Sequence, residues 1–243
     1  MSDDSYYDEF PVVPTAPKTS GYAGHLVDEV SFSGNAQDVC VCYVDMMNST
    51  QVAATLGPSS IAPYYSEFLN SMSTIIANFG AEIVKTAGDA VIYYFPQTAN
   101  KHDICAFKNA LECSLYMMAA HRHINNALSL RRLPPVNYRI SADYGTVQVA
   151  KSPNSSRADL FGQTMNRCAK INTHAPANGT VICDTLHEVV SSLSEYAFDP
   201  LGTYKVGGED HVLYSLKSRE KRNILDPFIR PSPARPQHQS RKA

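Results

Sequence analysis

The sequence of 243 residues contains no long hydrophobic run, no internal repeat and almost no net charge. A membrane-spanning helix needs at least about 18 consecutive apolar residues, and because no such run occurs we expect no membrane association. The first residues are acidic and lack the basic and apolar regions of a secretory signal, which predicts a cytoplasmic protein. With a formal net charge of −2, the chain is not expected to bind nucleic acid.

The apolar residues that are present, 44% of the chain, are enough for one well-packed domain. Charge is unevenly distributed, because residues 1–38 contain seven acidic residues and one lysine, whereas residues 217–243 contain eight basic and two acidic residues. Residues 1–37 lack periodicity and are predicted to form an acidic flexible arm. Residues 38–216 are predicted to fold, and residues 217–243 to form a basic, proline-containing tail.

Periodic apolar residues predict the order of the secondary structure elements. A short apolar strand begins at Val39, and a helix begins near Pro58 and ends at Gly80. The expected order continues with a hairpin (83–87 and 90–95), a helix (103–124), two strands around a tight turn at Gly145 (138–150), a helix (163–174), a strand (180–183), a helix (185–192) and two closing strands (198–206 and 211–216). This order predicts an α+β fold with a ferredoxin-like βαββαβ core, in which helices cover one face of an antiparallel-rich sheet.

Two aspartates lie at the ends of these expected strands. Asp45 ends the first apolar run, and Asp89 lies in the turn of the expected hairpin. If the hairpin lies beside the first strand, the two carboxylates are neighbours. Mg²⁺ prefers oxygen ligands, and a pair of ions about 3.5–4 Å apart can stabilise the attacking and leaving oxygens of a phosphoryl displacement. Either aspartate alone could equally be a strand-end cap or a turn residue.

Three segments carry a resemblance to a known family, namely DMMNST from Asp45, KTAGDA from Lys85 and DLFGQTMN from Asp159. In this order they resemble the class III nucleotide cyclase catalytic domain, and the resemblance covers residues 39–216. It identifies residues 38–216 as the expected catalytic domain. It also implies two Mg²⁺ or Mn²⁺ ions per active site, with the carboxylates of Asp45 and Asp89 and the carbonyl of Met46 as ligands. By the same resemblance, the backbone N–H groups around Asn48, Ser49 and Thr50 contact the phosphates.

The family's base-recognition pair corresponds to Lys85 and Asp159. A lysine can donate to a ring nitrogen of adenine, and an aspartate can accept from its amino group. Guanine presents the opposite groups at both places, so each contact would be lost. The resemblance therefore implies an adenylate cyclase that converts ATP to 3′,5′-cyclic AMP and pyrophosphate, and it disfavours the alternative, a guanylate cyclase. Without the resemblance, Lys85 would be an ordinary surface lysine on a strand.

Asn166 matches the family asparagine that orients the ribose and supports the transition state. Four residues later the family has an arginine, and this chain has Lys170 on the same helix face. Lysine keeps the charge but loses the planar fork that bonds two phosphate oxygens. A catalytically silent ATP-binding module therefore remains a second hypothesis. Arg139 and Lys205 match the family's triphosphate-binding cations, although Arg139 could equally be a strand-end charge.

The family builds each active site from two subunits, with the base and transition-state residues of one facing the metal-binding aspartates of the other. This chain contains both sets. The resemblance therefore implies a homodimer with two equivalent, shared sites.

Overall fold

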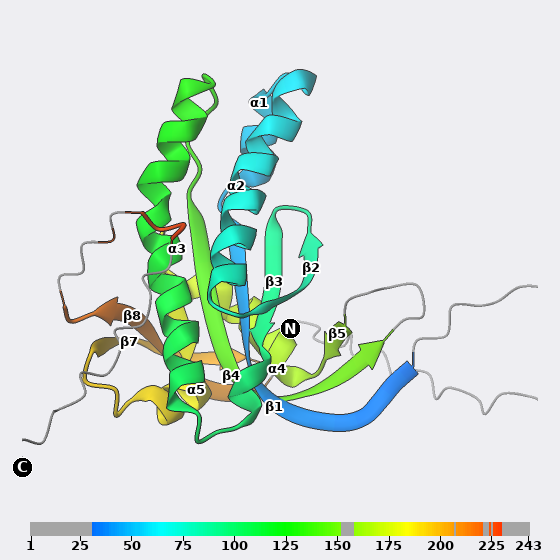
Figure 1. Cartoon of the computed structure of the whole chain (residues 1–243), viewed down its shortest axis with the longest axis vertical. Helices are drawn as coiled ribbons and strands as arrows, with labels where there is room; N and C mark the ends of the chain where they lie inside the picture. Colours follow the sequence, from blue (N-terminus) through cyan, green and yellow to red (C-terminus); the bar gives the residue numbers. More distant parts are fainter. Residues whose placement is uncertain (1–30, 152–157, 207, 221–223, 225, 230–243) are drawn as a thin grey trace, which may run out of the picture.

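The computed structural model describes residues 31–151, 158–206, 208–220, 224 and 226–229 (Figure 1). Most of the expected acidic arm and of the basic tail lies outside this range. The elements are β1 (Ser31–Met46), α1 (Ser49–Thr55), α2 (Pro58–Asn78), β2 (Glu82–Ala87), β3 (Ala90–Phe95), α3 (Ile104–Leu130), β4 (Tyr138–Lys151), β5 (Ala158–Phe161), α4 (Gln163–Ile171), β6 (Thr180–Cys183), α5 (Asp184–Val190), β7 (Tyr196–Val206) and β8 (Glu209–Ser218).

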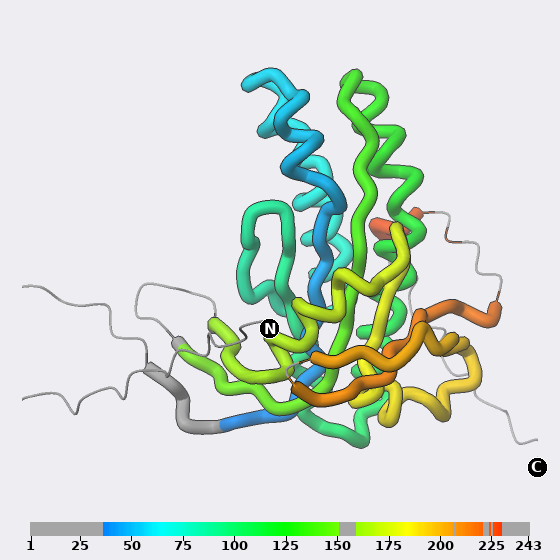
Figure 2. The backbone as a smooth tube through the Cα atoms, turned by 180° about the vertical axis from the view of Figure 1, so that it is seen from behind, coloured from blue at the N-terminus to red at the C-terminus, as the bar shows by residue number. Residues whose placement is uncertain are grey.

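Eight strands of the described chain form one sheet, in the order β2-β3-β1-β4-β6-β8-β7, with β5 paired to β4. Figure 2 shows the backbone from behind, with the hairpin of β2 and β3 beside β1. All neighbouring strands are antiparallel except β4 and β6. The predicted α+β fold with an antiparallel-rich sheet is therefore confirmed. None of the helices in the described residues is long and apolar enough to cross a membrane.

The two long helices begin and end where local sequence favours it. Pro58 is the first residue of α2, where its missing N–H costs no hydrogen bond, and Gly80 follows the helix with a φ of +74°. The side chain of Asp103 caps α3 by accepting a hydrogen bond from the backbone N–H of Ala106, at 3.1 Å. The helix α3 ends at Leu130, beyond its expected end at residue 124.

Side chains of β1 alternate between two hydrophobic clusters, one on each face of the sheet. On one face, Cys40 and Cys42 are buried against α2 and α3, with their sulfur atoms 3.9 Å apart. On the other face, Val39 and Val41 pack with Met165 of α4. The helices therefore do not all share one face as expected, because the apolar side of α4 covers the face opposite to α2 and α3.

The strand β4 is continuous through Gly145, so the tight turn predicted there is wrong. Gly145 pairs with Val39 of β1. A Cβ atom at this position would lie 2.8 Å from the hydroxyl oxygen of Thr164 in α4. The glycine is therefore required by the close approach of a helix to the sheet, and not by a turn.

Three further boundaries differ from those expected. The strand β1 begins at Ser31, inside the segment predicted as an arm, and the short helix α1 was not predicted. Part of the expected tail lies on the core, because Ile224 and Phe228 pack against the α2–α3 cluster. The side chain of Asn78 in α2 donates a hydrogen bond to the carbonyl of Phe228, at 2.5 Å. Residues 151–157, whose polar composition predicts a surface loop, lie outside the described residues except for Lys151.

Candidate active site

Strand register places the predicted aspartates side by side. Asp45, near the end of β1, pairs with Ala90 of β3 and with Arg139 of β4. Asp89 occupies the two-residue turn just before Ala90, where Gly88 supplies the required positive φ of +64°. The backbone N–H of Met46 donates to the carbonyl of Asp89, at 3.4 Å, and so ties the end of β1 to the turn. The predicted adjacency of the two aspartates is confirmed.

The two carboxylates influence each other electrostatically. Burial, and then the charge of Asp89, raise the pKa of Asp45 to about 6, against the opposing effects of Arg139 and the Met46 N–H. Two like charges held together in a half-buried position are stabilised by a bound cation. Oxygen ligands of this kind suit Mg²⁺ or Mn²⁺, so the residues present fit a divalent metal site.

The expected phosphate-contacting segment follows directly after this pair. Asn48 has a left-handed backbone conformation, with a φ of +56°, and its side chain does not cap α1. Ser49 is buried at the start of α1, and Thr50 is exposed. The segment thus lies at the end of β1 next to Asp45, as predicted, and the structure leaves its role in phosphate binding as a proposal.

Lys85 and Asp159 come together from β2 and β5, 74 residues apart in sequence. The Lys85 Nζ atom lies 3.2 and 3.3 Å from the two carboxylate oxygens of Asp159. A bulge between Ile83 and Lys85 turns the lysine toward the face covered by α4. Both side chains are nearly half exposed, so the ion pair itself contributes less than about 1 kcal/mol and is readily exchanged for ligand contacts.

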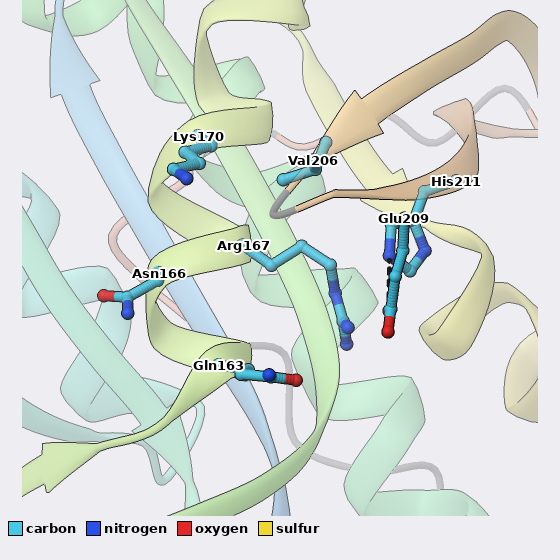
Figure 3. Close-up of a pocket in the computed structure, with 7 residues that line it drawn as sticks. All are labelled: Gln163, Asn166, Arg167, Lys170, Val206, Glu209 and His211. Carbon is cyan, nitrogen blue, oxygen red and sulfur yellow. Dashed lines mark ion pairs between the residues drawn. The ribbon is translucent and has the colours of Figure 1, made fainter. Parts of the chain in front are cut away.

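Asn166 and Lys170 are exposed on α4, one helical turn apart. Figure 3 shows that both project from the same side of the helix, whereas Arg167 points to the other side. Within the described part of the chain, no hydrogen bond or ion pair joins them to Asp45 or Asp89. One subunit therefore assembles the aspartate pair and the Lys85–Asp159 pair, but does not link the aspartates to Asn166.

Lys205 lies on the β7–β8 hairpin, whereas Arg139 and Lys85 lie on β4 and β2. It is exposed on β7, opposite Asp210 of β8. Its neighbour Val206 lines a pocket between α4 and β8. The lining of this pocket is drawn in Figure 3 and consists of Gln163, Asn166, Arg167, Lys170, Val206, Glu209 and His211.

A buried ion pair that the sequence did not predict anchors α4. Asp143 of β4 is fully buried and accepts hydrogen bonds from Arg167 Nε, at 2.6 Å, and from the hydroxyl of Thr185 in α5. Burial raises the pKa of Asp143, against the opposing effect of Arg167. The only available signal was a single acid in an apolar strand, and this does not identify its partner.

A second unpredicted polar group lies where α5 meets β8. Asp184 accepts hydrogen bonds from the Cys183 thiol at 3.2 Å, from His211 Nδ1 at 2.9 Å and from the Val212 N–H at 3.1 Å. Burial opposes the ionisation of Asp184, but these donors outweigh it and lower its pKa. Cys183, Asp184 and His211 are potential metal ligands. The Asp184 carboxylate already binds the Cys183 thiol and His211 Nδ1, whereas Asp45 and Asp89 hold two like charges together, so the aspartate pair remains the better candidate metal site.

The comparisons with known proteins agree with this geometry. The family model described as "Adenylate and Guanylate cyclase catalytic domain" matches residues 32–218. No curated protein sequence matches the chain significantly.

Solved structures of nucleotide cyclases share the fold. The guanylyl cyclase Cya2 superposes with a TM-score of 0.70 and 19% identity, over 78% of this chain and 97% of that one. The adenylyl cyclase CyaB from P. aeruginosa gives 0.69 and 17%, over 79% and 98%. The guanylate cyclase domain of RhGC from Catenaria anguillulae, solved with GTP, gives 0.64 and 19%, over 77% and 100%. At these identities the likeness establishes the fold alone.

Proposed function

Since the chain belongs to the family of adenylate and guanylate cyclase catalytic domains, we propose that it is an adenylate cyclase that makes 3′,5′-cyclic AMP and pyrophosphate from ATP. Members of this family use divalent metal ions and bind nucleotides. The observation that carries the choice of ATP is the contact between Lys85 and Asp159, at 3.2 Å. A cation and a carboxylate held together offer one donor and one acceptor to the edge of a base.

Adenine fits this pair of groups better than guanine. Its amino group donates to the Asp159 carboxylate while a ring nitrogen accepts from the Lys85 ammonium group. Guanine would place a carbonyl against the carboxylate and a ring N–H against the ammonium group, leaving partly buried polar groups unpaired. Sites that read a substrate through such hydrogen bonds can reject the wrong one by a factor of about 10⁴.

Asp45, Asp89 and the Met46 carbonyl are the groups that would hold the divalent ions. When bound, these ions supply positive charge to the triphosphate and to the ribose 3′-oxygen. In the reaction, the 3′-oxygen forms a bond to the α-phosphorus, the bond from that phosphorus to pyrophosphate breaks, and the 3′-hydroxyl loses its proton. The chain contributes two fixed carboxylates and Arg139 beside them, which favours binding of a metal–triphosphate complex.

Asn166 and Lys170 would complete the site from a second copy of the chain. Asn166 orients the ribose, and Lys170 supplies positive charge where negative charge develops on the phosphate. Lys205 is a further cation for the triphosphate. Because both side chains of α4 are exposed and are not joined to the aspartates of their own chain, a homodimer with two shared sites accounts best for the arrangement.

The direct test is product formation by the purified protein, followed by mass spectrometry, with ATP or GTP and with Mg²⁺ or Mn²⁺. Cyclic AMP from ATP alone, with specific activity that rises with protein concentration, is the expected result. The matched control is Asp45→Asn, which keeps the side-chain shape but loses the charge and should abolish turnover. Cyclic GMP as the main product would instead favour the guanylate cyclase alternative.

Lys170 favours a second candidate function, an ATP-binding module without turnover. Lysine cannot make the two-pronged contact of the family arginine, and loss of one transition-state hydrogen bond costs about 10²–10³ in rate. Saturable ATP binding without any cyclic product from either nucleotide would support this reading. Restoring the arginine, with Lys170→Arg, would then be expected to restore turnover.

A further inference from the structure

Tyr43 lies near the Lys85–Asp159 pair, on the face of the sheet covered by α4. It precedes Asp45 by two residues in β1, so both side chains project from the same face of the sheet. Tyr43 pairs with Ile92 of β3, and Lys85 of β2 pairs with the same Ile92. Tyr43 and Lys85 therefore flank Ile92 in one row across three strands, with Asp45 in the adjacent row.

The phenol group of Tyr43 is a hydrogen-bond donor at neutral pH. Its side chain is half-buried against the cluster that contains Val41 and Cys168. Burial, followed by smaller contributions from Cys168 and Asp159, raises the pKa of this phenol to about 12. The contribution from Asp159 indicates that the phenol lies within electrostatic reach of the Lys85–Asp159 pair.

The Tyr43 hydroxyl makes no hydrogen bond to any residue that the structure describes. Other buried tyrosines of the sheet behave differently. Tyr94 donates to Glu82 at 2.8 Å, and Tyr138 donates to the carbonyl of Met117 at 2.5 Å. The Tyr43 hydroxyl is not among the buried unpaired polar atoms of the described residues, so it is an accessible donor beside Lys85 and Asp159 that a ligand bound to them can reach.

We propose that Tyr43 is a third base-contacting residue, whose hydroxyl donates a hydrogen bond to an acceptor atom of the purine bound at Lys85 and Asp159. This inference rests on the proposed function. It adds a donor from β1 to the donor from β2 and the acceptor from β5. The three groups come from three strands of one subunit, so the base is held by rigid backbone positions.

The test uses Tyr43→Phe, which removes only the hydroxyl oxygen, and three probes titrated with Mn²⁺ in a calorimeter. The probes are 3′-deoxyATP, which lacks the attacking oxygen, ribose 5-triphosphate, which lacks the base, and inorganic tripolyphosphate. Loss of one hydrogen bond is expected to weaken binding of 3′-deoxyATP by about 3- to 10-fold. Binding of the two probes without a base is expected to stay unchanged.

The matched control is Tyr94→Phe on the same face of the sheet. Tyr94 uses its hydroxyl within the chain, so this variant is expected to lower the melting temperature and to leave nucleotide affinity unchanged. Tyr43→Phe is expected to weaken nucleotide binding and to leave the melting temperature unchanged, because the Tyr43 hydroxyl makes no hydrogen bond to the described residues. This contrast separates a ligand contact from a structural role.

Two results would overturn the inference about Tyr43 alone. These are unchanged binding of 3′-deoxyATP to Tyr43→Phe, and equal weakening of ribose 5-triphosphate or tripolyphosphate. A wild-type protein that binds none of the three probes would overturn the proposed function together with it.

Discussion

If the active sites are shared between two subunits, two inactive variants should restore activity when they are mixed. Asp45→Ala removes a metal ligand, and Asn166→Ala removes the group that orients the ribose. Each variant alone should form homodimers in which both sites carry the defect, so each is expected to be inactive. In a heterodimer, one site receives both defects and the other receives none.

The size of the recovery follows from the symmetry of a dimer. Equal amounts of freely exchanging subunits give about half heterodimers, and each heterodimer has one intact site of two. The mixture should therefore reach about a quarter of the wild-type specific activity. The basis in the structure is that Asp45 and Asn166 of one chain are not joined by any hydrogen bond or ion pair among the described residues.

The assay measures cyclic AMP formed by the mixture, with heterodimer formation checked by native mass spectrometry. The control is a mixture of Asp45→Ala with Asp89→Ala. These two variants damage the same half of the site, so every heterodimer lacks an intact aspartate pair and no recovery is expected. If Asp45→Ala and Asn166→Ala form heterodimers but stay inactive, each chain must hold a whole site of its own, and the shared arrangement is refuted.

Other measurements address single residues of the same site. Asp45→Asn removes a carboxyl group whose pKa is raised to about 6 by burial and by Asp89. Because the folded pKa lies above the ordinary value, ionisation of Asp45 destabilises the metal-free fold above about pH 4, and the variant should melt a few degrees higher. A lower melting temperature would contradict the repulsion between the two carboxylates. In the wild type, Mn²⁺ must displace that proton, so Mn²⁺ affinity measured by calorimetry should fall as pH drops below 6, whereas a flat profile from pH 5 to 7 would exclude Asp45 as a ligand. Lys170→Arg should raise the turnover number by about tenfold or more, and a decrease would show that the site is adapted to lysine. Arg167→Met leaves the buried Asp143 carboxylate without its charged partner and should lower the free energy of unfolding by about 3–5 kcal/mol, measured by urea titration. A loss below about 1 kcal/mol would show that this ion pair does not anchor α4.

The parts of the site that could be predicted from sequence are those that follow from neighbouring strands. Asp45 and Asp89 are adjacent because a strand, a helical crossover and a hairpin bring their ends together, and each step has a clear periodic signal. The contact between Lys85 and Asp159 has no such signal. It was expected only from the family motifs. The direction of Lys85 depends on a bulge in β2, and the position of Asp159 depends on the pairing of β5 with β4, and no local sequence pattern specifies either feature.

The predictions that the structure corrects, and the contacts that were not predicted, also have identifiable physical causes. Gly145 was predicted in a turn, because a glycine needed for close helix packing looks the same in sequence as one needed for a positive φ. The partner of Asp143 could not be predicted, because Arg167 lies on the far side of a helix that was expected to cover the same face as the others. Phe228 reaches the core through a contact with Asn78, 150 residues away, inside a segment whose prolines and charges favoured an unstructured tail.

The ion pair between Lys85 and Asp159 has a thermodynamic consequence for ligand binding. The two side chains already hold each other in place without a nucleotide, and Asp159 also accepts from the backbone N–H of Leu160, at 3.0 Å. Little side-chain entropy is therefore lost at these positions when a base binds. Differences in affinity between purines should consequently appear mainly in the binding enthalpy, as each base exchanges one internal ion pair for its own set of hydrogen bonds.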